Sequence, residues 1–99
     1  MLSSDRRDTK SLNFRNRQRE MTWSSARHIN SIVVNYRRDT GGFDGTRVYV
    51  GDVEVGQIEE QSGKRTYIFG GLEGNHTQVR VVGPKSGMSN LANVQVYGE

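Results

Sequence analysis

Residues 29–51 read INSIVVNYRRDTGGFDGTRVYVG, in which two strand-like runs flank a charged, glycine-rich loop. In the first run Ile32, Val34 and Tyr36 fall on one side of an extended chain, and the valines of residues 47–51 repeat the alternation. The β-branched residues of both runs suit a pleated, half-buried surface. This stretch therefore predicts two strands, each with one buried face.

The loop between these runs, residues 37–45, is the candidate working surface of the chain. Five of its nine residues are Gly or Asp, which tolerate the backbone conformations of tight reversals. The segment therefore predicts a turn that presents polar side chains at one end of the strands.

Short alternating runs separated by glycine-containing turns continue to the end of the sequence, at intervals typical of sandwiches and barrels. The register of VEVGQI, QVRVV and NVQVY suits an antiparallel sheet with one solvated face. We expect no long helix after residue 27 and predict an all-β domain. The expected strands span residues 29–36, 47–51, 53–58, 65–69, 77–82 and 93–98.

Residues 1–26 show neither a helical nor a strand period. Residues 1–38 carry nine Lys or Arg against three Asp or Glu, a net of +6, whereas residues 39–99 carry five against eight, a net of −3. We therefore divide the chain into a basic, weakly patterned arm over residues 1–26 and a β-sandwich over residues 27–99. Trp23 is the exception in the arm, and we expect it to dock on a core.

The composition argues against several kinds of chemistry. The chain has no cysteine, which removes disulfides, thiolate metal sites and cysteine nucleophiles. His28 and His76 are its two histidines, and it has neither a nucleophile elbow nor a phosphate-binding glycine loop. Glu59 and Glu60 are adjacent, so their carboxylates point apart and are poorly placed to flank a glycosidic bond. We expect a binding protein and not an enzyme.

Charge and hydropathy also bear on partners and location. No run approaches the roughly 18 apolar residues of a membrane span, and residues 1–10 lack the apolar core of a secretory signal. Basic residues 1–38 suit nucleic acid, but only Phe14 and Trp23 are interleaved with them as stacking groups, so we rank nucleic acid below other partners. Asn75-His76-Thr77 is a glycosylation sequon, which has meaning only in a secreted protein.

The motifs, taken in order, resemble those of one family. They are ARHINSIVVNYRRD at residues 26–39, GTRVYVGD at 45–52, TYIF at 66–69 and QVRVVGPKSGMSNLANVQVYGE at 78–99. Over residues 27–99 this order resembles the fucose-binding F-type lectins, relatives of the discoidin or coagulation-factor C-type domains. The resemblance implies an antiparallel, discoidin-like jelly-roll β-sandwich, an extracellular protein, and loops at one end that bind a glycan, in particular a fucosylated one.

The resemblance also assigns site residues. Arg37 and Asp39 match the family's Arg-x-Asp motif, in which a guanidinium donates to sugar oxygens and the carboxylate fixes its orientation. We expect Phe43 to pack against the C–H face of the sugar, while Asp44 and Arg47 are nearest to the position of the family's second basic residue. An alternative stays open, in which Arg37 and Asp39 form an exposed ion pair of little energetic value.

The chain departs from the family pattern at several positions. Thr40-Gly41 replaces the cysteine pair that follows Arg-x-Asp, no histidine occupies the upstream site position, and the first part of the family domain is not recognisable in residues 1–26. Two explanations stay open: a divergent carbohydrate-binding module, or a non-catalytic structural or protein-interaction sandwich that has lost the sugar site. A sandwich that is incomplete at its N-terminus exposes an edge or an apolar face, so we expect a homo-oligomer.

Family members often hold a structural calcium ion, but the residues here argue against one. Ala92-Asn93 stands where the family has a glutamate ligand, and the only aspartates of residues 1–26 are Asp5 and Asp8, beside two arginines. A calcium site needs about six to eight oxygen ligands with carboxylates among them. We expect no bound metal or other cofactor, and a stability that is insensitive to chelators.

Overall fold

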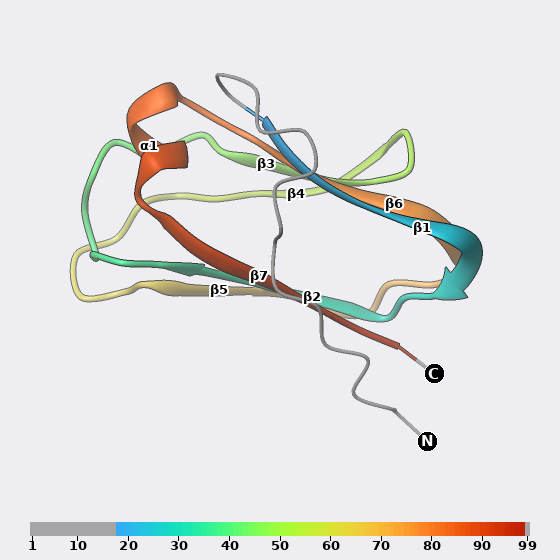
Figure 1. Ribbon diagram of the computed structural model, residues 1–99. Helices are drawn as coiled ribbons and strands as arrows, with labels where there is room; N and C mark the ends of the chain where they lie inside the picture. Colours follow the sequence, from blue (N-terminus) through green and yellow to red (C-terminus); the bar gives the residue numbers. More distant parts are fainter. Residues whose placement is uncertain (1–17, 99) are drawn as a thin grey trace.

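Alternating apolar and polar residues produce two antiparallel β-sheets that face each other in two layers (Figure 1). The structure, a computed structural model, describes residues 18–98. In that range the strands are β1 (Gln18–His28), β2 (Ser31–Tyr36), β3 (Arg47–Val50), β4 (Val53–Gln57), β5 (Thr66–Phe69), β6 (Asn75–Val82) and β7 (Leu91–Tyr97), and the short helix α1 (Lys85–Ser89) precedes β7.

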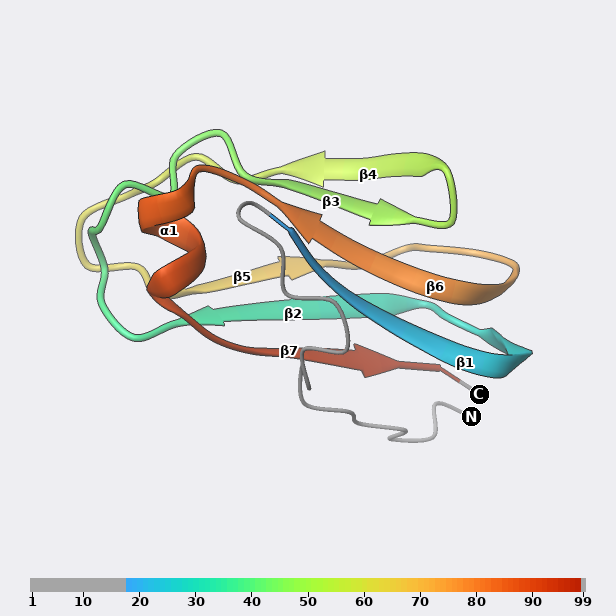
Figure 2. The ribbon, with the colours of Figure 1, turned by 45° about the horizontal axis from the view of Figure 1, so that its top comes forward.

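The strands form a four-stranded sheet in the order β1-β6-β3-β4 and a three-stranded sheet in the order β5-β2-β7. Every pairing in both sheets is antiparallel. Figure 2 shows the two layers from the side, with α1 at one end of the sandwich. The predicted all-β antiparallel sandwich is therefore confirmed, while the finer assignment as a jelly roll stays a prediction.

The core lies between the two sheets and follows the alternation of the sequence. Along β2, the inward residues Ile32, Val34 and Tyr36 are buried, and each is flanked by a half-buried residue on the outer face. The β3 valines, Val48 and Val50, close the core from the opposite sheet. Each side chain of this size contributes about 1.5–3 kcal/mol when it is fully buried, so the stretch at residues 29–51 supplies much of the packing.

The boundary expected at residue 26 falls inside a strand. β1 pairs with β6, and its inward residues Met21 and Trp23 are 6% and 9% exposed. The expectation that Trp23 docks on the core is confirmed, but the expectation of a loosely structured arm fails for residues 18–26. The apolar residues of β1 stand between Arg, Glu, Thr and Ser, and pairing with β6 supplies the order that local sequence does not indicate. The rest of that arm, residues 1–17, lies outside the described residues.

Helix α1 lies between the expected strands 77–82 and 93–98, in residues 83–90, where the glycine-containing sequence predicts a turn. Pro84 caps its N-terminus, the N–H of Met88 donates to the Pro84 carbonyl oxygen at 2.9 Å, and the Met88 side chain is completely buried. Gly87 packs directly on the backbone of Phe43, where a side chain would not fit. Among the described residues, no helix has the length and hydropathy that a membrane crossing requires.

Candidate binding cleft beside strands β4 and β5

Two loops meet at the α1 end of the sandwich and are joined by carboxylate side chains. They are the β2–β3 loop, residues 37–46, and the β4–β5 loop, residues 58–65. The Glu60 carboxylate accepts the N–H of Phe43 at 2.9 Å, and the Asp44 carboxylate accepts the N–H of Glu60 at 2.9 Å. Each loop therefore holds the backbone of the other, and we call this pair of contacts the loop latch.

Phe43 lies in the core and not on the surface. Its side chain is 0% exposed, and its ring stacks on Tyr36 with a centroid distance of 3.8 Å and an interplanar angle of 8°. Tyr67 meets both rings edge-on. The expectation that Phe43 packs against a bound sugar is therefore wrong. The physical reason is that the glycine-rich loop folds back: Gly42 and Gly45 adopt left-handed backbone conformations that other residues disfavour.

Arg37 and Asp39 do not form the expected pair. The Asp39 carboxylate accepts the N–H of Gly63 at 2.7 Å, and no ion pair within residues 18–98 joins it to Arg37. Arg37 is exposed, and its backbone N–H donates to the Asn90 carbonyl oxygen at 2.9 Å. Asp39 is thus a second link between the two loops, and the alternative of a simple Arg37–Asp39 surface pair is wrong as well.

Arg47 is not part of the contacts between the β2–β3 and β4–β5 loops. It begins β3, in the four-stranded sheet, and its Nε is 3.7 Å from the Glu54 carboxylate. The two side chains are 55% and 41% exposed, so the pair adds little stability. The four residues assigned from the resemblance therefore do not converge: Phe43 is buried, Asp39 holds a neighbouring loop, and the other two are exposed, one in the loop after β2 and one on β3.

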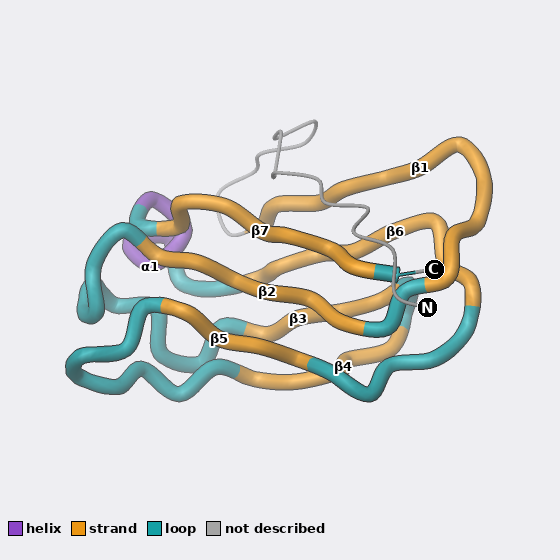
Figure 3. Tube along the Cα trace, turned by 90° about the horizontal axis from the view of Figure 1, so that it is seen from below, coloured by secondary structure: helices purple, strands orange, loops and turns teal. Residues whose placement is uncertain are grey.

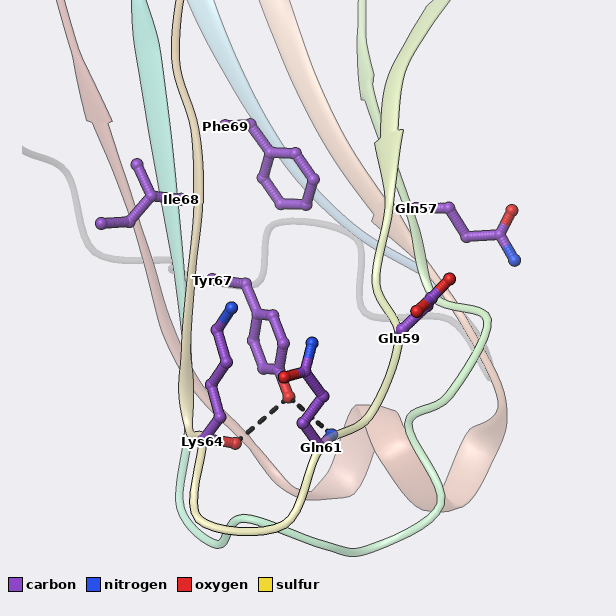
Figure 4. A pocket seen from close by; sticks show the side chains of 7 residues that line it. All are labelled: Gln57, Glu59, Gln61, Lys64, Tyr67, Ile68 and Phe69. Carbon is purple, nitrogen blue, oxygen red and sulfur yellow. Dashed lines mark hydrogen bonds between the residues drawn. The ribbon is translucent and has the colours of Figure 1, made fainter.

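A cleft of about 280 Å³ lies where the edge strands of the two sheets, β4 and β5, run beside each other (Figure 4). The rings of Tyr67 and Phe69 project from β5 toward β4, and the β4–β5 loop brings polar side chains around them. The residues that line the cleft are Gln57, Glu59, Gln61, Lys64, Tyr67, Ile68 and Phe69.

Tyr67 organises the polar end of this cleft. Its hydroxyl accepts the N–H of Gln61 at 3.2 Å and donates to the Lys64 carbonyl oxygen at 3.1 Å. The Lys64 ammonium lies 5.0 Å from the centre of the Tyr67 ring, in the range of a cation–π contact. These contacts leave a carboxylate, an amide and an ammonium group at an exposed rim, on Glu59, Gln61 and Lys64. The signal that sequence reasoning missed is this polar run between two predicted strands.

A second cleft of about 320 Å³ lies farther along the same side of the sandwich. It is lined by Val50, Val53, Val55, Gly71, Leu72, Glu73 and His76, and is more apolar than the first. Between the two clefts, the Phe69 ring sits directly on Gly56 of β4, where a side chain would overlap it. Phe69 therefore separates a polar cleft from an apolar one.

Tyr36 has a pKa that departs clearly from its usual value. Burial raises the pKa of its hydroxyl to about 12. The Thr46 side chain acts on this pKa in the opposite direction. The Thr46 hydroxyl donates to the Phe43 carbonyl oxygen at 2.6 Å, and the buried Tyr36 hydroxyl has no hydrogen-bond partner among the described residues. Because the group is enclosed by the aromatic cluster, we assign it to the core and not to the cleft.

The described residues contain no group of three or more His, Asp or Glu side chains placed to hold a metal ion. Comparison with models of protein families, with curated proteins and with solved structures finds no match to this chain. The resemblance to F-type lectins therefore stays a prediction that rests on the sequence motifs, and the site has to be argued from its own geometry.

Proposed function

We propose that this chain is a non-catalytic carbohydrate-binding β-sandwich, and that the sugar lies in the polar cleft between β4 and β5. The observation that carries the proposal is the lining of that cleft. A carboxylate, an amide and an ammonium group, on Glu59, Gln61 and Lys64, surround two aromatic side chains in an open depression. Such a combination of polar and aromatic groups suits a ligand with hydroxyls on its edge and C–H bonds on its faces.

The chemistry of each group supports this choice. A sugar hydroxyl both donates and accepts hydrogen bonds, so a carboxylate, an ammonium and an amide offer complementary partners. The half-buried ring of Phe69 provides apolar surface for C–H groups, while Tyr67, which is 5% exposed, holds the adjoining loop through its hydroxyl. Pockets for drug-sized ligands have volumes of about 300–1,000 Å³, and the cleft, at about 280 Å³, falls just below that range. We infer that it holds a single sugar ring while the rest of a glycan extends into solvent.

Asp39 acquires a positioning role in this proposal. Its hydrogen bond to the N–H of Gly63 holds the tip of the β4–β5 loop, between Gln61 and Lys64. Arg37 is exposed but does not line the cleft, so in this proposal it does not hold the primary sugar. Fucose as the sugar and an extracellular location follow from the family resemblance alone and stay predictions.

A glycan array followed by titration of the best ligand tests the proposal. Glu59→Gln removes a charged acceptor from the cleft, and a hydrogen bond to a charged group is worth roughly 1.5–3 kcal/mol, which corresponds to a loss of about tenfold or more in affinity. The matched control is Glu54→Gln, which makes the same change on β4 outside the cleft and should leave affinity unchanged.

Two outcomes would overturn the proposal in different ways. Absence of binding to any glycan at millimolar concentration would refute carbohydrate recognition. If Arg37→Ala abolished binding while Glu59→Gln had no effect, carbohydrate recognition would stand, but the site would be the loop that the family resemblance indicates.

A further inference from the structure

Figure 3 shows the three-stranded sheet from its outer side. Two neighbouring rows of outward-facing positions on this sheet hold uncharged residues. In one row, Thr66 of β5, Asn35 of β2 and Asn93 of β7 stand side by side across the strands. In the next row, Ile68, Val33 and Gln95 do the same. None of these six residues is charged, although 25% of the chain is. We call these six residues the neutral face.

Hydrogen bonds along the first row order the neutral face. The Thr66 hydroxyl donates to Asn35 Oδ1 at 2.8 Å, and Asn35 Nδ2 donates to Asn93 Oδ1 at 2.7 Å and, more weakly, to Gln95 Oε1 at 3.4 Å. The amide nitrogens of Asn93 and Gln95 have no acceptor among the described residues. A primary amide carries both donors and acceptors, so the face offers unused donors beside acceptors that have a second lone pair.

The outer face of the four-stranded sheet is different in kind. There Arg47 pairs with Glu54 across β3 and β4, and the Arg80 guanidinium lies 4.7 Å from the centre of the Tyr49 ring. Charged side chains of this kind favour contact with water. The two exposed sheet surfaces of one small domain therefore differ, and only one of them has the low charge that is characteristic of interface cores.

We propose that the neutral face is the contact between two copies of this chain. The formal net charge of each copy is +3, so two copies repel each other, and an uncharged patch allows them to meet without bringing like charges together. A twofold contact requires a patch that is complementary to itself. Amide rows that hold both donors and acceptors meet this requirement, and Ile68, which is 69% exposed, adds apolar area at the edge.

The size of the neutral face sets the strength of this contact. Neighbouring strands lie about 4.8 Å apart, so three strands form a narrow patch that is smaller than the roughly 800 Å² per partner of a standard stable interface. We therefore expect a weak dimer whose formation depends on concentration. The six residues include no aromatic ring, and Tyr97, in the adjoining row beside Ser31, is half-buried, so we take a second copy and not a sugar as the occupant.

Sedimentation velocity of the full chain over a concentration series tests this inference. The mean mass of the wild type should rise from one chain to two with concentration. Gln95→Lys places a cation on the neutral face and should weaken dimerisation by about tenfold, the equivalent of about 1.4 kcal/mol. The matched control, Gln78→Lys, makes the same substitution on β6, on the outside of the opposite sheet, and should leave dimerisation unchanged. Thr66→Lys on β5 provides a second variant, and thermal unfolding confirms that each variant is folded.

A mixing experiment makes the test specific. Gln95→Glu should also be monomeric at concentrations where the wild type dimerises, but an equimolar mixture with Gln95→Lys should recover the dimer, because the added charges are then opposite.

The inference is overturned if the wild type stays monomeric at about 1 mM, if Gln78→Lys weakens dimerisation as much as Gln95→Lys, or if the mixture does not associate. Loss of glycan binding by Gln95→Lys without any change in mass would overturn it as well and would identify a sugar as the occupant. The neutral face shares Ile68 with the β4–β5 cleft but does not include Glu59, so Glu59→Gln should leave the mass unchanged whether or not the cleft binds a sugar.

Discussion

Phe43 shows at the scale of one residue how a loop side chain becomes part of the core. It is completely buried and stacks on Tyr36. Phe43→Ala should therefore reduce the free energy of unfolding by about 3–5 kcal/mol, as truncation of buried aromatic residues does. Chemical denaturation measures this loss. Arg37→Ala, in the same loop but exposed, should change stability by less than about 0.5 kcal/mol. Equal effects of the two substitutions would contradict the burial of Phe43.

Because of Tyr36, the free energy of unfolding should depend on pH in the alkaline range. Burial raises its pKa to about 12 in the folded chain, whereas the unfolded value is about 10. Between these values the unfolded chain releases the proton first, so unfolding becomes more favourable as pH rises. Stability should be independent of this group below about pH 10 and fall by up to about 1.4 kcal/mol per pH unit above it. Denaturation at several alkaline pH values, compared with Tyr36→Phe, isolates this slope. A wild-type slope equal to that of Tyr36→Phe would contradict the shifted pKa.

The sequence predicted the burial of residues in strands where apolar and polar residues alternate. It did not predict the environment of loop residues, whose side chains could face either solvent or core. Ile32 and Val34 could be assigned to the core because one extended run determines which side they face. Phe43, in a glycine-rich loop, has no such period, and only the path of the loop decides whether its ring faces solvent or core. Asp39 could be identified as a polar loop residue, but its partner Gly63 is 24 residues away, so their hydrogen bond has no local signature.

The loop latch stabilises the contact between two loops, whereas the neighbouring Glu59 faces the cleft, so substitutions at these two positions should affect stability differently. Glu60→Ala leaves the N–H of the buried Phe43 without an acceptor, which costs roughly 1–3 kcal/mol. Glu59→Ala removes a neighbouring carboxylate that faces the cleft and should leave the free energy of unfolding nearly unchanged. Urea denaturation of both variants gives the comparison. If Glu59→Ala destabilised the protein as much as Glu60→Ala, the two acidic residues would not have the separate roles assigned here.

The contact between β4 and β5 can be tested with a pair of glycines. A side chain at Gly56 would overlap the Phe69 ring, so Gly56→Ala should destabilise the fold by about 1–3 kcal/mol. Gly70, immediately after β5, has nothing within 4 Å of the position of an added methyl group, so Gly70→Ala should be neutral or stabilising by a few tenths of a kcal/mol. Thermal unfolding of the two variants decides between these expectations. A neutral Gly56→Ala would show that Phe69 does not pack on β4.

Six of the strands could be predicted at the scale of elements because each presents its own alternation between glycine-containing turns. β1 could not, since only Met21 and Trp23 mark its inward side and the strand shifts register between Thr22 and Arg27. The polar cleft could not be predicted from the sequence for a related reason. Its walls come from β5 and from the chain around the end of β4, elements that belong to different sheets and meet only when the sandwich closes.

At the scale of the whole molecule, the sandwich presents different surfaces in different directions. The loop end is held by carboxylate contacts to backbone N–H groups, the side along β4 and β5 carries the two clefts, and the outside of the three-stranded sheet carries the neutral face. The polar cleft and the neutral face share Ile68 and otherwise use different side chains, so a glycan in the cleft and a second copy on the face would be compatible. A weak dimer would place two clefts on one particle, and the resulting bivalency would raise the apparent affinity for clustered glycans.

The role of β1 in the whole fold gives the last prediction. A chain that begins at residue 27 lacks Met21 and Trp23, each worth about 1.5–3 kcal/mol of burial, and leaves the edge of β6 unpaired. Domains of this size are stable by about 5–15 kcal/mol, so the loss should abolish cooperative unfolding and expose apolar surface. A chain that begins at residue 18 keeps the complete four-stranded sheet and should unfold cooperatively. Calorimetry and dye binding compare the two chains. A cooperative, monomeric chain of residues 27–99 would restore the boundary at residue 26 and show that β1 is an appendage to the sandwich.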